Sequence, residues 1–139
     1  MAASDPEYVE LRAASAFSFL AAASHPEDLV SRAAELGQGA LALSDADGVY
    51  AVPRFVKAAR AAGIRPIVGA RVRLDLDGGA LLDPAPPGGP RGPAGLDPPS
   101  LLLLCQDAAG WRNLCELLTD AHAGRYKGEA RVTPAMLDR

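Results

Sequence analysis

Histidine, cysteine and long apolar runs are scarce in this chain of 139 residues. Its two histidines exclude a histidine-rich metal site, and its two cysteines are too few for a disulfide framework. No apolar run approaches the roughly 20 residues that span a bilayer, so no membrane segment is predicted. The chain has 14 Lys and Arg residues and 17 Asp and Glu residues, so its formal net charge is −3 at pH 7. This charge excludes a strongly basic nucleic-acid-binding module. We expect a reduced, cytoplasmic protein.

Short apolar runs punctuate the chain and predict its strands. They lie at residues 8–11, 40–43, 66–74 and 100–104. The run at 40–43 is continuously apolar, which is typical of a strand buried on both faces of a parallel sheet, and residues 100–104 are predicted as a fourth buried strand. Because these runs alternate with helical patterns, the sequence predicts an α/β fold with mainly parallel strands and right-handed crossovers.

Two helices are predicted in the first half of the chain. Ser24 and Glu27 have the spacing of a capping box. The helix that they open has an apolar face reaching Leu36, and Gly37 is a natural stop. A second helix is predicted over residues 52–62, with an apolar face of the same periodicity.

The second half begins with a segment of different composition. Residues 78–99 contain 6 glycines and 7 prolines, a density that holds neither a helix nor a central strand, so we expect a flexible insertion. Asp107 is the predicted N-cap of a third helix that buries Trp111. Thr133 and Pro134 have the N-cap and first-turn pattern of another helix.

Carboxylates follow the second predicted strand. In open α/β folds, functional groups collect at the carboxyl ends of the strands, and Asp45 and Asp47 lie at such an end. Carboxylate oxygens are suitable ligands for a hard cation such as Mg²⁺. The alternative, which the sequence favours, is that Asp47 and Gly48 form a turn and that Asp45 caps backbone donors.

A basic cluster follows the third predicted helix. It comprises Arg125, Lys127, Arg131 and Arg139. Runs of charge are usually solvated faces, and Tyr126 is the sole aromatic residue among them, so contact with solvent or another domain is favoured over DNA binding. His122, at the end of the same helix, suits the negative end of the helix dipole.

Five segments in order resemble the polymerase-and-histidinol-phosphatase (PHP) domain that begins the bacterial C-family DNA polymerases. They are residues 8–20, 23–27, 41–50, 63–70 and 110–114. Residues 17–20 and 23–27 are more similar to the error-prone branch than to the replicative branch. The resemblance implies that residues 1–139 are the N-terminal portion of a PHP domain, a distorted β/α barrel.

The metal-ligand positions of that family are replaced in this chain. Arg12 and Ala14 stand in place of two histidines, and Ala21 in place of an acid. Ala46 replaces another histidine, and Arg71 replaces a glutamate. Alanine has no lone pair to offer, and arginine does not lose its proton to become a ligand. The resemblance therefore implies a degenerate site that holds no metal, with no catalytic residue in this chain.

The two arginines admit more than one role. Arg12 and Arg71 are predicted to face Asp45 or Asp47 and to replace the metals with internal salt bridges, because guanidinium and carboxylate match in geometry. The alternatives are that both arginines point to solvent or that they bind an anion.

The resemblance implies a function that belongs to a longer protein. Its parent would be an error-prone DNA polymerase, a nucleotidyltransferase of DNA replication and repair that uses Mg²⁺ in a separate palm domain. This chain would be structural and without a cofactor of its own. Its partners would be the remaining polymerase domains and, through them, DNA and the sliding clamp. The alternatives are a stand-alone interaction module and a metal-dependent phosphoesterase whose ligands come from elsewhere.

Overall fold

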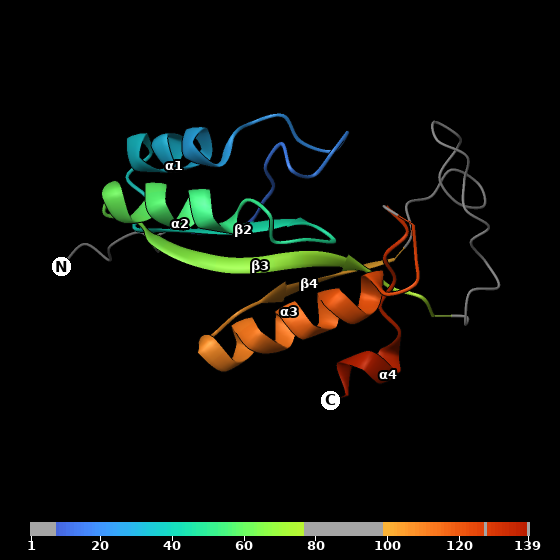
Figure 1. The fold of residues 1–139 in the computed structure, drawn as a ribbon. Helices are drawn as coiled ribbons and strands as arrows, with labels where there is room; N and C mark the ends of the chain where they lie inside the picture. The colour runs from blue at the N-terminus through green and yellow to red at the C-terminus, as the bar shows by residue number, and fades with distance from the viewer. Residues whose placement is uncertain (1–7, 77–98, 127, 139) are drawn as a thin grey trace.

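Strands and helices alternate in the part of the chain that the computed structural model describes, residues 8–76, 99–126 and 128–138. In chain order the elements are β1 (Glu10–Ala13), α1 (Pro26–Glu35), β2 (Ala40–Ala46), α2 (Val52–Ala61), β3 (Arg65–Arg73), β4 (Ser100–Leu104), α3 (Ala108–His122) and α4 (Pro134–Leu137) (Figure 1). The insertion predicted at residues 78–99 lies, apart from Pro99, outside the described residues. None of the helices described is long and apolar enough to cross a membrane.

The four strands form one curled sheet in the order β1-β2-β3-β4. The pairs β1–β2 and β2–β3 are parallel, as predicted, whereas β4 runs antiparallel to β3. A parallel neighbour needs a crossover connection, usually a helix, and the glycine- and proline-dense sequence before β4 has no helical pattern. Strand β4 is also half-buried rather than fully buried, because it lies at an edge of the sheet.

Both hydrophobic cores lie on one face of the sheet. Leu43 of β2 belongs to the core made with α1 and α2, and Ala70 of β3 belongs to the core made with α3. The register pairs Leu43 with Val68, two residues before Ala70, so Leu43 and Ala70 point to the same side. We call this side the helix face. Residues 46, 69, 71 and 73 alternate with the core residues and therefore lie on the opposite face.

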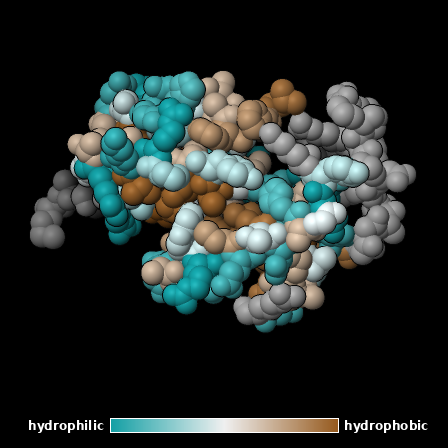
Figure 2. All heavy atoms as spheres, in the orientation of Figure 1, coloured by the Kyte–Doolittle hydropathy of each residue, from teal (hydrophilic) through white to brown (hydrophobic). Residues whose placement is uncertain are grey.

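The apolar surface between the two cores is visible over β3. Figure 2 shows a hydrophobic band there, between α2 and α3. Phe55 of α2 is fully buried, as its predicted place on the apolar face requires. The prediction that Trp111 of α3 lies in the core is wrong, because its side chain is 37% exposed. Trp111 lies in the first turn of α3, before the buried Leu114 and Leu118.

Strands β3 and β4 approach closely at Gly69. A Cβ atom at this position would come closer to the carbonyl oxygen of Leu103 than real Cβ atoms do, and it would lie 2.8 Å from a methyl group of Leu104. Because the first of these atoms is backbone, it cannot move aside like a flexible side chain. Glycine is therefore the residue that fits here.

The helix ends follow the prolines and glycines of the sequence. Helix α1 starts one residue later than predicted: its N-cap is His25, whose backbone N–H donates to the Asp28 carboxylate at 3.3 Å. Pro26 takes the first helical position, where a missing N–H costs nothing. Leu36 is the C-cap, and it is exposed rather than part of the apolar face. Gly37 follows with a positive φ of 71°, as a C-terminal glycine stop does.

Two further caps agree with the sequence. The Asp107 carboxylate accepts a hydrogen bond from the backbone N–H of Gly110 at 2.8 Å and so caps α3. Thr133 precedes α4, whose first residue is Pro134. Strand β1 begins at Glu10 rather than Tyr8, two residues later than predicted.

Candidate functional site

Asp45, near the carboxyl end of β2, is buried and held by hydroxyl and amide donors. Its Oδ1 accepts from the Ser15 backbone N–H and from the Ser18 hydroxyl, each at 2.7 Å. Its Oδ2 accepts from the Ser15 hydroxyl at 2.7 Å. All three residues are at most 2% exposed. The carboxylate therefore has its charge compensated by hydrogen bonds inside the protein.

These bonds attach the segment after β1 to the end of β2. The Ser18 hydroxyl oxygen also accepts from the Ala46 backbone N–H at 2.9 Å, and the Ser15 hydroxyl oxygen accepts from the Phe17 N–H at 3.2 Å. Each serine hydroxyl thus donates to the carboxylate and accepts from an amide. The register between β1 and β2 is irregular, so this network fixes a connection that the sheet alone holds weakly.

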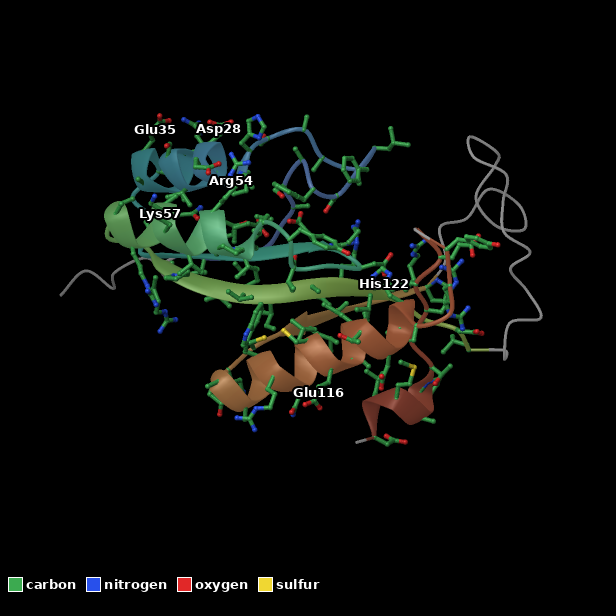
Figure 3. All side chains as sticks on the ribbon, in the orientation of Figure 1. Asp28, Glu35, Arg54, Lys57, Glu116 and His122 are labelled. Carbon is green, nitrogen blue, oxygen red and sulfur yellow. The ribbon has the colours of Figure 1, made fainter. Side chains whose placement is uncertain are left out.

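Asp47, two residues after Asp45, makes a second group of hydrogen bonds at this end of the sheet. Its φ of +52° is left-handed, as the turn interpretation of Asp47 and Gly48 requires. Its carboxylate accepts from Arg73, through Nε at 2.7 Å and through the backbone N–H at 3.2 Å. Its carbonyl oxygen lies 2.7 Å from Nε2 of His122, which places the end of α3 beside the end of β2 (Figure 3).

The arginine–carboxylate pair differs from the predicted one. Asp47 pairs with Arg73 instead of Arg12 or Arg71, and Asp45 pairs with serines. The turn at Asp47 explains why its carboxylate meets Arg73 rather than Arg71. The Asp47 N–H donates to the Arg71 carbonyl oxygen at 2.8 Å, and the Asp47 side chain then reaches Arg73, which is the next arginine on the same face of β3. Arg12 is exposed on β1, with β2 between it and β3.

The other positions at which the resemblance implies metal ligands lie around the same strand ends. Ala46 is the last residue of β2, and the register pairs it with Arg71. Ala14 follows β1 and is half-buried, whereas Ala21 is exposed in the loop before α1. The structure thus brings two of the five positions, Ala46 and Arg71, side by side. Within the described ranges, no group of three or more His, Cys, Asp or Glu residues is arranged to hold a metal ion.

Arg131 enters this region from the loop after α3. Burial lowers the pKa of its guanidinium, and the neighbouring charges of Arg73 and Arg125 lower it further. Asp47 and Asp75 oppose these effects. Of the predicted basic cluster, Lys127 and Arg139 lie outside the described residues. Arg73 and Arg131 therefore lie near one another at the end of β3, with Asp47 and Asp75 as the acids beside them.

A separate groove of about 370 Å³ lies at the other edge of the sheet, between β4, α3 and α4. Its floor is apolar, with Leu103, Leu117 and Met136, and Glu116 and Asp120 line its acidic side. No residue of the Asp45 and Asp47 networks lines it.

The network around Asp45 contains residues that sequence reasoning missed. No sequence motif marks Ser15 and Ser18, because their partner Asp45 lies 30 and 27 residues away. Arg73 had a usable signal: it alternates with Val72 after Arg71, so the two arginines share one face of a strand.

The chain belongs to the PHP domain family, whose family model matches residues 10–139. The resemblance to error-prone polymerases is confirmed by its relatives. This chain is 45% identical over 119 residues to an error-prone DNA polymerase of Anaeromyxobacter sp. (strain K). The match covers 86% of this chain and 9% of the relative. An error-prone DNA polymerase of Mycobacterium bovis is 44% identical to this chain over 126 residues. That match covers 89% of this chain and 10% of the relative. The chain thus spans about a tenth of the length of these relatives.

Solved structures agree on the fold. An amidohydrolase from Chromobacterium violaceum superposes with a TM-score of 0.56 at 21% identity, covering 81% of this chain and 32% of that one. The curled sheet with its helices on one face is accordingly part of a PHP fold.

Proposed function

We propose that this chain is a structural, metal-free PHP segment of an error-prone DNA polymerase. Its role is to pack on the remaining polymerase domains and hold them in a working arrangement. DNA synthesis, with its magnesium ions, its DNA and its sliding clamp, belongs to other parts of the longer cytoplasmic protein. The similarity to segments of much longer polymerases supports this assignment.

The observation that carries the metal-free role is the state of the two carboxylates. Asp45 is committed to Ser15 and Ser18, and Asp47 to Arg73. A divalent cation at these strand ends would have to displace those donors. It would also meet the positive charge of Arg71, at a position where the resemblance implies an acid.

Metal content and phosphoesterase activity test this part of the proposal. After dialysis against Mn²⁺ or Zn²⁺ and removal of free metal, we expect well under one ion per chain by mass spectrometry. We also expect no metal-dependent hydrolysis of bis(p-nitrophenyl) phosphate. Stoichiometric metal together with Mn²⁺- or Zn²⁺-dependent turnover would establish the phosphoesterase alternative instead.

The scaffolding role is tested in the full-length polymerase. Ser18→Ala removes a buried hydroxyl of the Asp45 network, so it should lower the thermal stability of the enzyme and its primer extension at elevated temperature. Arg12→Ala, at an exposed replaced position, is the matched control and should leave both unchanged. Equal primer extension by Ser18→Ala and wild type, measured near the melting temperature, would contradict a supporting role.

A further inference from the structure

The loop that joins β1 to α1 displays two large apolar side chains to solvent. Phe19 is 73% exposed and Leu20 is 93% exposed, the highest value among the exposed large hydrophobic residues that the structure describes. Figure 1 shows this loop projecting past the start of α1, and Figure 2 shows strongly hydrophobic atoms at its outer end. We call Phe19 and Leu20 the loop tip. Single exposed apolar residues are ordinary, but an adjacent pair at the end of a projecting loop is typical of a contact surface.

Hydrogen bonds hold the loop tip in place. The Ala16 N–H donates to the Ser24 carbonyl oxygen at 2.8 Å, which closes the base of the loop. Just after the tip, the Ala21 and Ala22 N–H groups donate to the Ser18 carbonyl oxygen at 3.0 and 3.1 Å. The Ser18 hydroxyl belongs to the buried network described above. The tip is therefore presented by a fixed turn, so little backbone freedom is lost when a partner binds.

Leu20 has a backbone conformation that leucine disfavours. Its φ is +63°, in the left-handed region where glycine and asparagine are tolerated and a bulky side chain is strained. This conformation lowers the stability of the fold. Because the side chain is almost fully exposed, it gives little packing within the chain in return. Folding of the chain alone would favour glycine at position 20, so leucine there is better explained by a contact outside the chain.

The composition of the loop limits the kind of partner. Residues 13–24 carry no charged side chain, so an uncharged apolar surface surrounds the tip. Segments that lie on a membrane surface carry Lys and Arg beside their apolar residues, and this chain has a net charge of −3, so a bilayer is disfavoured. An uncharged apolar tip matches a desolvated pocket on a protein surface. The chain spans about a tenth of the length of its polymerase relatives, so a longer protein of this kind offers such a surface within one polypeptide.

We propose that the loop tip inserts into an apolar pocket on the remaining part of the polymerase. This inference rests on the proposed function and names the surface through which the chain packs. Leu20 is the anchor, because docking removes its exposed apolar area from water. The Asp45 network has a positioning role, because Ser18 joins it to the turn that carries the tip.

Photo-cross-linking in the full-length polymerase tests the proposal. The first probe variant is Leu20→p-benzoylphenylalanine, and the second is Phe19→p-benzoylphenylalanine, which keeps an aromatic ring and no left-handed residue changes. After irradiation, we expect mass spectrometry to identify cross-links to a peptide outside residues 1–139 of the same polypeptide. The matched control is Leu36→p-benzoylphenylalanine, at another exposed leucine, and it should give several-fold less of that product.

A polar substitution measures what the anchor contributes. Asparagine tolerates the left-handed conformation, so Leu20→Asn keeps the turn and removes the apolar group. In the polymerase that carries the probe at position 19, Leu20→Asn should lower the cross-link yield several-fold, whereas Leu36→Asn should leave it unchanged. In the chain alone, Leu20→Asn should leave Tm unchanged or raise it, because it relieves strain and removes little packing. This comparison separates loss of the contact from loss of the fold.

Three results would overturn the proposal. The first is cross-linking from position 20 that equals that from position 36 or stays within residues 1–139. The second is a product of doubled mass on a denaturing gel, which would make a second copy the partner. The third is co-sedimentation of the wild-type chain, but not of Leu20→Asn, with phosphatidylcholine and phosphatidylglycerol vesicles, which would make a lipid surface the partner. Failure of the proposed function is a separate result, in which Ser18→Ala leaves primer extension unchanged although the cross-link forms.

Discussion

Removal of the Ser18 hydroxyl tests how firmly the Asp45 network holds the end of the sheet. Ser18 donates to the Asp45 carboxylate at 2.7 Å and accepts from the Ala46 N–H at 2.9 Å, so Ser18→Ala breaks two bonds at once. A hydrogen bond to a charged group contributes about 1.5–3 kcal/mol, and a donor left without an acceptor adds to the loss. We therefore expect a decrease of about 2–4 kcal/mol in the free energy of unfolding.

Urea denaturation followed by circular dichroism measures this change, and thermal denaturation should show a fall in Tm on the order of 10 °C. The control is Ser31→Ala, because the Ser31 hydroxyl is exposed on α1 and bonds to a backbone carbonyl within the helix. That change should alter stability by less than about 0.5 kcal/mol. If Ser18→Ala is no more destabilising than Ser31→Ala, the network does not anchor the segment after β1.

Three further predictions concern other parts of the structure. Gly69→Ala should destabilise the chain by about 1–3 kcal/mol in urea denaturation, because the new Cβ would collide with the backbone of β4. The control is Gly110→Ala in α3, where a Cβ would make ordinary contacts, and it should stabilise the chain by up to about 1 kcal/mol. Equal effects of the two substitutions would refute the steric argument. Arg54→Ala removes a bidentate pair with Glu27 between α2 and α1. The hydrogen bond from Arg54 lowers the pKa of Glu27 in the folded protein. The pair therefore stabilises the fold at pH values above the ordinary glutamate pKa, and this contribution is lost as the pH falls through the lowered pKa of Glu27. The difference in Tm between the variant and the wild type should shrink at low pH, and a difference that does not depend on pH would contradict this reasoning. Burial raises the pKa of the Cys105 thiol, so its alkylation by iodoacetamide at pH 8 should be slower than in the urea-unfolded chain, and equal rates would show that the thiol is not shielded.

Most of the secondary structure could be predicted because it depends on local chemistry. The apolar run that forms β2 and the proline in the first turn of α2 determine those elements within a few residues of sequence. The direction of β4 could not be predicted in this way. It depends on the connection that precedes it, and periodicity within Ser100–Leu104 is the same for both directions.

The partners of the two carboxylates differ from the arginines that the sequence suggested. Asp45 and Asp47 do lie at the strand ends, as parallel topology requires. Their partners depend on side-chain direction over long separations: the Asp45 network joins residues up to 30 positions apart, and the left-handed turn at Asp47 decides which arginine its carboxylate meets. Neither fact is encoded in spacing along the chain.

The placement of both hydrophobic cores on one face of the sheet has a consequence for how this fold tolerates change. Residues 46 and 71 lie on the opposite face, so substitutions there remove no packing between the sheet and its helices. Selection for the fold and selection for the chemistry at the strand ends therefore act on different positions. Substitutions at residues 46 and 71 could therefore accumulate while the same scaffold continued to assemble.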